Sequence, residues 1–408
     1  MEQVLYQLPD GWSLHKLKAL TTKIGSGATP KGGDKAYKPS GVSLIRSLNV
    51  HDYLFKEDKL AFIDNEQADA LKNVIVESGD VLLNITGASI ARCCIVPDEI
   101  LPARVNQHVT IIRPTEKVDS KFLNYLIVNP KFKAQLLWQG AGGATRQALT
   151  KAMVEELDIP LPNLQEQKRI VEKLDALLTR IDTAIEHLQE SVTLADSLYA
   201  STINEQMMQA IEFAGLSTVE KHIEQIQTGT TPPTKQPEFY ENGDINWFAP
   251  SDFGDHDILS DSNKKLSQKA FDAGKARKFD AGTIMLVAIG ATIGKIGYLE
   301  QDASSNQQIT GMKFNSDIIP RYAYYWFRFI KPEILANAST ATLPIINQKG
   351  IKALSFCAPN KQLQETICKK IDEVSNFRNT VKAELIEKVE LMRSLKASIL
   401  DSAFKGEL

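Results

Sequence analysis

A long internal repeat dominates this sequence. The segment from Ile24 to Pro30 reads I-G-S-G-A-T-P and returns from Ile226 to Pro232 as I-Q-T-G-T-T-P, so both copies contain G-x-T-P. The two segments begin 202 positions apart (226 − 24). A repeat of this length is too long for a solenoid, and it implies a whole domain plus a helix that was duplicated once. Such a duplication predicts approximate two-fold symmetry.

Further matches between the two copies keep their order and nearly their spacing. They are Gly79–Leu83 with Gly282–Leu286, Gly87–Ile90 with Gly290–Ile293, Asn106–Thr110 with Asn306–Thr310, and Pro162 and Gln167 with Pro359 and Gln364.

Each copy contains short apolar, β-branched runs bounded by Gly, Pro, Asp or Asn, which is typical of strands. We expect strands at residues 42–45, 81–85, 95–96 and 109–112, and at 245–248, 284–289, 296–299 and 309–314. Residues 121–128 and 321–327 fit a short buried helix, although their length leaves a strand possible.

Two long segments without Pro or Gly show apolar residues that step alternately by four and three positions, which is a heptad pattern. The predicted seam of the first helix contains Leu174, Leu178, Ile181, Ile185, Leu188, Val192, Ala195 and Tyr199. The predicted seam of the second contains Ile367, Ile371, Val374, Arg378, Val381, Leu385, Lys388, Met392, Leu395 and Ile399.

The predicted fold class is α+β, with two tandem-duplicated mixed α/β domains separated by two long antiparallel helices that form a coiled coil with pseudo-two-fold symmetry. The predicted boundaries are 1–162 and 213–359 for the domains and 163–212 and 360–408 for the helices. The alternative is that each seam packs only on its own domain.

The charge of the chain limits the classes of function that it can have. The net charge of −3 argues against a protein that coats nucleic acid by bulk attraction alone. Lysines and arginines nevertheless concentrate in residues 1–46 and 264–278. Each basic patch can also be solvated surface.

The four cysteines form neither a zinc motif nor a disulfide framework and are interpreted as buried hydrophobes: Cys93, Cys94, Cys357 and Cys368. No signal peptide or membrane span is predicted, so we expect a cytoplasmic protein without a membrane partner.

Catalytic motifs are missing from the sequence. Asn129-Pro130-Lys131-Phe132 lacks the second proline of an adenine methyltransferase loop, and Gly290–Ile296 lacks the spacing of a phosphate-binding loop. Glu57-Asp58-Lys59 has no equivalent in the second copy, and no histidine is placed for triad chemistry. These observations predict a binding protein without a catalytic site or a metal site.

Several motifs together resemble the specificity subunits of type I restriction-modification systems. They are the opening Leu8-Pro9-Asp10-Gly11-Trp12 with Leu17, the repeated G-x-T-P turn, the G-A-[ST]-I run, the Asn-Gln pair, the proline-led entry to a long helix, and the closing segment Ser398–Leu408. The second copy, which starts near Leu216, lacks the Leu-Pro-x-Gly-Trp opening, and its helix entry reads P-N-K-Q-L-Q-E from Pro359.

The resemblance implies that each domain is a target-recognition domain that reads one half of a split double-stranded DNA target. It also implies that the helices separate the two half-sites and dock methyltransferase subunits, expected to be two, and that restriction subunits join this core. This chain then binds no cofactor, and S-adenosylmethionine, ATP and Mg²⁺ bind to the partner subunits.

Phosphate contacts position a protein on DNA, whereas contacts to base edges specify the sequence. For phosphates we propose Lys31, Lys35, Lys38, Lys264, Lys265, Lys275 and Lys278. For bases we propose Arg46, Asn49, Arg92, Arg146 and Gln147 in the first domain, and Trp247, Ser251, Lys295, Asn347 and Gln348 in the second. The Asn-Gln pairs and the G-x-T-P turns are matched in both copies and are expected to hold loop structure. For partner docking we propose the helix flanks and ends, including Leu164, Leu177, Leu363 and Phe404.

Two other functions stay open at this point. One is a coiled-coil scaffold or adaptor whose duplicated domains bind proteins and no DNA. The other is an enzyme with an unrecognised active site.

Overall fold

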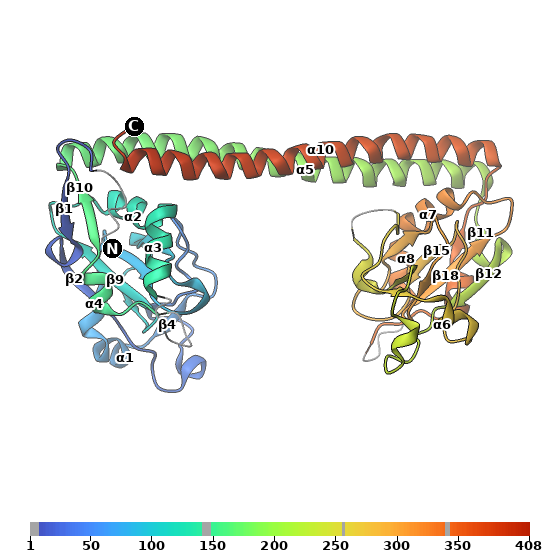
Figure 1. Cartoon of the computed structure of the whole chain (residues 1–408), viewed down its shortest axis with the longest axis horizontal. Coiled ribbons are helices and arrows are strands. Elements are labelled where there is room, and N and C mark those ends of the chain that lie inside the picture. Colours follow the sequence, from blue (N-terminus) through green and yellow to red (C-terminus); the bar gives the residue numbers. More distant parts are fainter. Residues whose placement is uncertain (1–7, 141–147, 255–257, 339–342) are drawn as a thin grey trace. The chain divides into compact units, whose positions relative to one another are not determined.

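The computed structural model describes residues 8–140, 148–254, 258–338 and 343–408 (Figure 1). The chain forms two compact units: unit 1 contains Met1–Leu188 with Ile386–Leu408, and unit 2 contains Gln189–Leu385. Each long helix is therefore divided between the units, whereas the sequence-based boundaries had treated the helices as separate segments. The predicted α+β architecture with two long helices is confirmed.

Unit 1 is built around a four-stranded antiparallel sheet with strand order β2-β9-β6-β7. Val81, Leu82 and Leu83 in β6 are all fully buried, because both faces of this sheet are covered. Alternate residues face opposite sides: Val81 and Leu83 pack with Phe122, whereas Leu82 packs against a second sheet, β4-β3-β8-β5. The strands of unit 1 are β1 (Ser13–Lys16), β2 (Thr21–Ser26), β3 (Val42–Ile45), β4 (Ala61–Ile63), β5 (Ile75–Val76), β6 (Val81–Asn84), β7 (Cys93–Ile95), β8 (Ala103–Val105), β9 (Val109–Pro114) and β10 (Asp158–Leu161).

Two short helices cover the first face of this sheet. α2 (Ser120–Val128) begins where the Asp119 side chain accepts a hydrogen bond from the Phe122 N–H, and α3 (Pro130–Gly140) follows it directly. The helical prediction for residues 121–128 is thus confirmed. Two smaller helices are α1 (Asn65–Ala70) and α4 (Lys151–Glu155).

Unit 2 repeats this plan, as the internal repeat predicts. Its main sheet has strand order β12-β18-β15-β16, and its second sheet has the order β14-β13-β17. In both units the second sheet contains one parallel pair, β3 with β8 and β13 with β17. The elements are β11 (Ser217–Thr218), β12 (Ile223–Thr228), β13 (Ile245–Phe248), β14 (Lys265–Leu266), α6 (Gln268–Asp272), β15 (Ile284–Val287), β16 (Ile296–Tyr298), β17 (Ser304–Ser305), β18 (Ile309–Phe314), α7 (Pro320–Phe329), α8 (Lys331–Ala336), α9 (Gln348–Ala353) and β19 (Ser355–Phe356).

The strands β2 and β12 were not expected from the sequence. Both are edge strands of the main sheets, paired on one side only, with β9 and with β18. Their sequences, TTKIGS and IEQIQT, are polar because one edge and part of one face meet solvent. A polar edge strand lacks the apolar run by which the other strands of the two main sheets were recognised.

The two long helices are α5 (Leu164–Ala214) and α10 (Lys361–Phe404). In unit 1, Lys396 near the end of α10 forms an ion pair with Asp182 of α5 at 2.7 Å. In unit 2, Arg378 of α10 pairs with Asp196 of α5 at 2.5 Å. Each unit therefore packs the earlier part of one helix against the later part of the other, which makes the pair antiparallel.

The predicted seam of α5 is confirmed by burial, since Leu174, Leu178 and Ile181 are buried and Ile185, Leu188 and Val192 are half-buried. In α10, Ile371 and Leu385 are buried, and Val374, Val381 and Ile399 are half-buried.

The prediction for the last part of α10 is partly wrong. Lys388 and Leu395 are exposed, whereas Val389 is buried and Lys396 is half-buried. After Leu385 the packed positions advance by four residues a second time, so Val389 and Lys396 replace Lys388 and Leu395 on the packed face, while Met392 and Ile399 keep their places. This change buries Val389 in place of a lysine, and an apolar side chain costs far less to remove from water than an ammonium group.

A buried glutamine joins the domain of each unit to the start of its long helix. The Gln167 side chain is fully buried; its Nε2 donates to the carbonyls of Lys117 (3.0 Å) and Pro162 (2.9 Å), and its Oε1 accepts from the Asp119 N–H (2.8 Å). The matching residue in the other copy is Gln364. It is also fully buried and makes the same three bonds, to Asp317, Pro359 and Ile319.

The expected docking residue Phe404 belongs to the core, because it is fully buried with its ring 5.4 Å from that of Phe122. Leu164 is exposed, and Leu177 and Leu363 are half-buried. Within the described part of the chain, no helix is both long enough and apolar enough to span a bilayer.

Candidate nucleic-acid interface

The repeated motifs of unit 1 meet at one end of its main sheet. β2 ends at Ser26, just before the G-x-T-P turn, and β9 begins at Val109, just after the Asn-Gln pair. These motifs lie side by side because β2 and β9 are antiparallel, with Ser26 opposite Thr110. β6 ends at the same edge, with Asn84 opposite Val109, and the G-A-S-I loop follows it. We call residues 26–30, 86–92 and 106–108 the loop end of unit 1, and residues 228–232, 289–295 and 306–308 the loop end of unit 2.

A close approach of two backbones explains the glycine of the G-x-T-P turn. A Cβ atom on Gly27 would lie 1.9 Å from the carbonyl oxygen of Val105, so no larger residue fits without moving the backbone. The Gly27 N–H donates to the carbonyl of Asn106 at 3.1 Å, and the Thr29 hydroxyl donates to Oε1 of Gln107 at 2.5 Å. The turn and the Asn-Gln pair thus hold each other, as the sequence predicted.

Unit 2 builds its loop end in the same way. A Cβ atom on Gly229 would lie 2.2 Å from Oγ of Ser305 and 2.4 Å from the carbonyl oxygen of Asn306. The Thr231 hydroxyl donates to Oε1 of Gln307, matching the bond of Thr29 to Gln107. The Gly229 N–H donates to the carbonyl of Ile309 at 2.9 Å, whereas the Gly27 N–H donates to that of Asn106. The two loop ends therefore share the close glycine contact and the Thr-to-Gln bond, but not every backbone hydrogen bond.

Arg46 and Asn49 follow β3 next to the loop end of unit 1, but they differ in accessibility. Asn49 is fully buried; its amide donates to the carbonyl of Lys56, and its Oδ1 accepts from the Arg46 N–H. In this conformation Asn49 supports the loop and does not present its amide to a base. Arg46 is half-buried and stacks on the Tyr37 ring, with its Cζ 5.1 Å from the ring centroid.

Arg92 and Lys295 occupy matching positions after the two G-A-[ST]-I runs. Each backbone carbonyl accepts a hydrogen bond at 2.9 Å from the last strand residue before the loop, Asn84 or Val287. Both side chains are half-buried. The Lys295 ammonium donates to the carbonyl of Phe253 at 2.9 Å, which ties it to the neighbouring loop.

The remaining base-contact candidates of unit 2 are spread over several elements. Trp247 is buried, and its indole N–H donates to the carbonyl of Thr230, so it supports the G-x-T-P turn. Ser251 is exposed. Asn347 caps α9 by accepting from the Gly350 N–H at 2.8 Å, and Gln348 donates to Oγ1 of Thr228 at 3.0 Å. Arg146 and Gln147 lie outside the described residues.

The proposed phosphate-binding lysines fall into two groups. Three form ion pairs, at 2.6 to 3.1 Å: Lys38 with Asp64, Lys265 with Asp261, and Lys278 with Asp302. The hydrogen bond from Lys278 lowers the pKa of Asp302, and that from Lys265 lowers the pKa of Asp261. The other four are exposed and form no ion pair with another residue in the described ranges: Lys31, Lys35, Lys264 and Lys275.

One cation was missed in the sequence. Lys72 lies seven residues before Gly79, and Lys275 lies seven residues before the matching Gly282. Lys72 is exposed, as Lys275 is. Applying the repeat offset to each proposed lysine would have found it.

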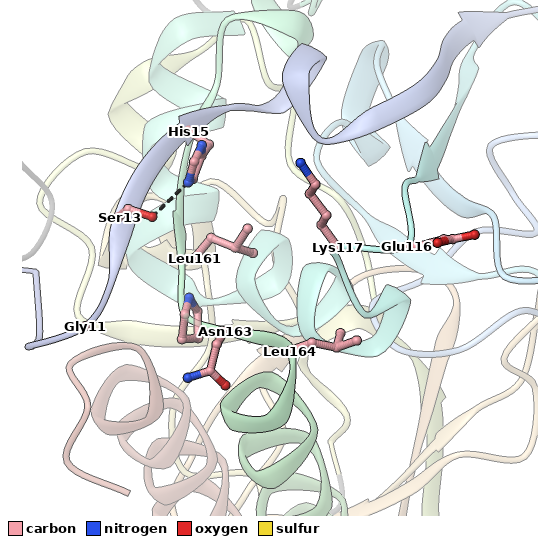
Figure 2. A pocket seen from close by; sticks show the side chains of 9 residues that line it. Gly11, Ser13, His15, Glu116, Lys117, Leu161, Asn163 and Leu164 are labelled. Atoms are coloured by element: carbon pink, nitrogen blue, oxygen red, sulfur yellow. Dashed lines mark hydrogen bonds between the residues drawn. The ribbon is translucent and has the colours of Figure 1, made fainter.

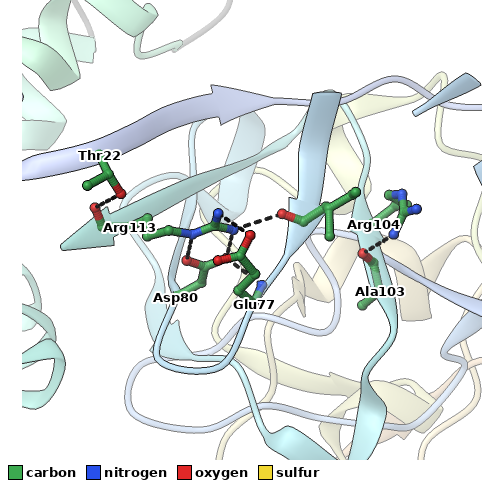
Figure 3. Close-up of polar contacts among 7 residues, drawn as sticks. Thr22, Glu77, Asp80, Ala103, Arg104 and Arg113 are labelled. Carbon is green, nitrogen blue, oxygen red and sulfur yellow. Dashed lines mark hydrogen bonds and ion pairs between the residues drawn. The ribbon is translucent and has the colours of Figure 1, made fainter. Parts of the chain in front are cut away.

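A buried ion pair lies at the other end of the main sheet of unit 1 (Figure 3). Asp80 is fully buried, and Arg113 near the end of β9 donates to both of its carboxylate oxygens, at 2.7 and 2.8 Å. Arg113 also donates to the carbonyl of Ile75 and pairs with Glu77 at 2.5 Å. The pKa of Arg113 is raised, and the largest cause is its hydrogen bonding to Asp80. The network joins β9 to the start of β6 and has a structural role.

A cleft of about 420 Å³ lies near the start of α5 in unit 1 (Figure 2). Ser13 and His15 of β1 hydrogen-bond to each other at 2.8 Å, and the Lys117 side chain lines the same cleft, while Glu116 is turned away. No carboxylate of a described residue orients the other ring nitrogen of His15, so this pair does not form a catalytic triad. The described ranges contain no group of His, Cys, Asp and Glu side chains that could hold a metal ion.

The sequence matches the family described as Type I restriction modification DNA specificity domain over residues 9–194 and 221–391. The type I restriction enzyme StySPI specificity subunit of Salmonella potsdam is 20% identical over 431 residues, covering 98% of this chain and 90% of that protein.

Two solved structures are similar along the whole chain. A chain described under "Structural basis underlying complex assembly and conformational transition of the type I R-M system" has a TM-score of 0.77 and 18% identity, and the match covers 99% of this chain and 100% of that chain. The HsdS subunit from Thermoanaerobacter tengcongensis has a TM-score of 0.55 and 18% identity, with 100% of both chains covered. At such low identity these similarities support the fold.

Proposed function

Because the chain belongs to the type I restriction-modification DNA specificity family, we propose that it is the subunit that reads the DNA sequence in a type I restriction-modification complex. In this proposal unit 1 reads one half of a split target in double-stranded DNA, and unit 2 reads the other half. The complex acts on DNA in the cytoplasm.

The observation that carries this proposal is the contrast between framework and side chains at the two loop ends. In both units the glycine of the G-x-T-P turn lies close to the carbonyl that precedes the Asn-Gln pair, at Val105 or Ser305. In both units the threonine of the turn also donates to the glutamine of that pair. The side chains that decorate this framework differ: His108 in unit 1 is matched by Gln308 in unit 2, and Arg92 by Lys295. Two domains with similar loop backbones but different side chains at the loop end suit the recognition of two different short DNA sequences.

The long helices suit a spacer and a docking surface for methyltransferase subunits. In the proposal the length of the unbroken helix α5 fixes the number of unread base pairs between the half-sites. Several large apolar side chains of the helix pair are exposed, which fits contact with another subunit. They are Leu194, Leu198, Phe377, Ile386, Leu391 and Leu395.

Catalysis in the proposal belongs to the partners. Two methyltransferase subunits supply S-adenosylmethionine-dependent methylation of adenine, and restriction subunits supply ATP- and Mg²⁺-dependent cleavage. A purified preparation of this chain alone should neither methylate nor cut DNA. Activity without partners would contradict this division of labour.

The proposal is tested by mapping methylated adenines in a host that lacks type I systems. The partner methyltransferase is expressed with the wild-type chain or without it, and genomic DNA is read by single-molecule sequencing. We expect one split motif that occurs only when the chain is present. Unchanged methylation, together with no binding of the assembled chain to fragments of genomic DNA in a gel shift, would instead favour an adaptor that binds proteins.

A further inference from the structure

Most lysines of the basic patch at residues 264–278 have no lysine counterpart in unit 1. In unit 2, β14 pairs with β13 in the way that β4 pairs with β3 in unit 1. Aligning these two strand pairs matches Lys264 with Ala61 and Lys265 with Phe62. Phe279 pairs with Ala303 in unit 2 as Val76 pairs with Ala103 in unit 1, so Phe279 corresponds to Val76. Lys278, one residue before Phe279, therefore corresponds to Ile75. The same alignment matches Lys275 with Lys72.

In unit 1 the segment around Lys72 lies against the G-x-T-P turn. The Val74 side chain is 3.0 Å from the position of a Cβ on Gly27, and β5, which follows, pairs with β8 beside that turn. Leu71 and Val74 are buried, whereas Lys72 between them is exposed. The backbone at Lys72 is thus held next to the loop end while its side chain meets solvent.

In unit 2 the segment around Lys275 is held at the equivalent place. The Thr230 hydroxyl of the turn donates to the Lys275 carbonyl at 3.0 Å, and the Arg277 guanidinium donates to the Thr228 carbonyl at 2.6 Å. The Lys275 N–H donates to the carbonyl of Ala270 at 2.8 Å. Its side chain is exposed.

Both lysines differ from their paired neighbours in having an uncompensated charge. Lys38, Lys265 and Lys278 each contact a carboxylate, whereas Lys72 and Lys275 form no ion pair within the described ranges of the chain. A contact that is the same in two domains reading different sequences must be to a feature that every DNA sequence has. The phosphodiester backbone is that feature, and a lysine ammonium binds it as a point charge.

We propose that Lys72 and Lys275 form a matched pair of sequence-independent DNA-backbone contacts, one beside each G-x-T-P turn. This inference rests on the proposed DNA-reading function. Each lysine then fixes the register of its own recognition unit on the duplex, and the unmatched side chains of the loop end read the bases.

The test measures affinity for DNA as a function of salt. The full chain, assembled with its partner methyltransferase, is titrated onto the cognate duplex and onto a random-sequence duplex of equal length between 50 and 200 mM KCl. Removing one phosphate contact should reduce the slope of log affinity against log salt by about 0.9, which corresponds to a loss of about 15-fold at 50 mM and about 4-fold at 200 mM. Lys72→Ala and Lys275→Ala should each show this loss on both duplexes, whereas Lys72→Arg and Lys275→Arg should keep the wild-type slope.

Matched controls come from the opposite ends of the two main sheets. Lys117 follows the far end of β9, and Lys221 precedes the far end of β12; both are exposed. Lys117→Ala and Lys221→Ala should keep the wild-type slope. The methylated motif should be the same for all of these variants.

Three results would overturn the inference: an unchanged slope in Lys72→Ala and Lys275→Ala, a changed methylation motif, or weaker assembly with the methyltransferase while DNA affinity is kept. The second would mean that these lysines read bases, and the third that they bind a protein partner. In each case the wild-type complex still binds its target with salt-dependent affinity. Failure of the wild type itself to bind would instead remove the proposed function.

Discussion

Replacing Gln167 by leucine tests how the domain of unit 1 is attached to its long helix. Leucine fills a similar volume but leaves the Asp119 N–H and the carbonyls of Lys117 and Pro162 without their partner. An unpaired buried polar group costs about 1–3 kcal/mol, so three of them should destabilise this junction by roughly 3–9 kcal/mol. The lower end of this range applies if water reaches the carbonyl of Lys117, which is an exposed residue. This destabilisation is a large part of the roughly 5–15 kcal/mol that stabilises a typical domain.

Hydrogen exchange followed by mass spectrometry reads this effect in each unit separately. Gln167→Leu should accelerate exchange in peptides covering residues 115–128 by about 100-fold or more, since each 1.4 kcal/mol is about a factor of ten. Peptides covering residues 315–329 should not change. Gln364→Leu should produce the reverse pattern, because its three bonds match those of Gln167.

Exposed glutamines in the same helical turns provide the control. Gln165 and Gln362 are exposed, so their leucine variants remove a glutamine without leaving a buried group unpaired. They should exchange as the wild type does. Equal acceleration by Gln165→Leu and Gln167→Leu, or no acceleration by either, would refute the reasoning.

Three further predictions follow from the described contacts. Gly27→Ala should reduce methylation of the target about tenfold or more, because the new Cβ would overlap a backbone carbonyl. The Cβ of Gly25→Ala would meet nothing within 4 Å, so this variant should leave the methylated fraction unchanged. Equal effects of the two substitutions would contradict this explanation. Asp80→Asn should lower the free energy of unfolding by about 3–5 kcal/mol, because Asp80 is fully buried beside an arginine, and calorimetry should show a lower melting temperature. Asp280→Asn breaks an exposed ion pair and should lower the free energy of unfolding by less than about 1 kcal/mol. Inserting four residues near Glu190 should lengthen α5 by about 6 Å and widen the unread spacer by about two base pairs, with both half-site sequences kept; sequencing that shows the original spacer would refute the spacer role of α5.

The features predicted correctly from the sequence are those that leave a periodic or repeated signal. The duplication predicted two units with matching sheets, and the apolar runs at residues 42–45, 245–248 and 309–314 coincide with β3, β13 and β18. The buried residues Leu174, Leu178 and Ile371 followed from their heptad spacing alone.

The errors arise where tertiary packing overrides local pattern. The heptad pattern continued through Lys388 and Leu395, because the sequence does not reveal the change in packed positions after Leu385. Asn49 and Trp247 have side chains suited to contacting bases, but both are buried. Asn49 bonds to Lys56 in its own loop, and Trp247 bonds to Thr230 in the G-x-T-P turn. Side-chain type predicted what these residues could bond to and could not predict which partner they have.

A chain with two copies of the first recognition domain tests the central claim most directly. Residues 216–359 are replaced by residues 8–162, so that both positions carry the same loop end, and methylated adenines are mapped by single-molecule sequencing in a host that expresses the partner methyltransferase. If each unit reads one half-site, the two halves of the methylated motif should become the same sequence on opposite strands, because duplicated readers with two-fold symmetry recognise an inverted repeat. The half read by unit 2 of the natural chain should disappear. A folded, assembled hybrid that still methylates the natural motif would contradict the account.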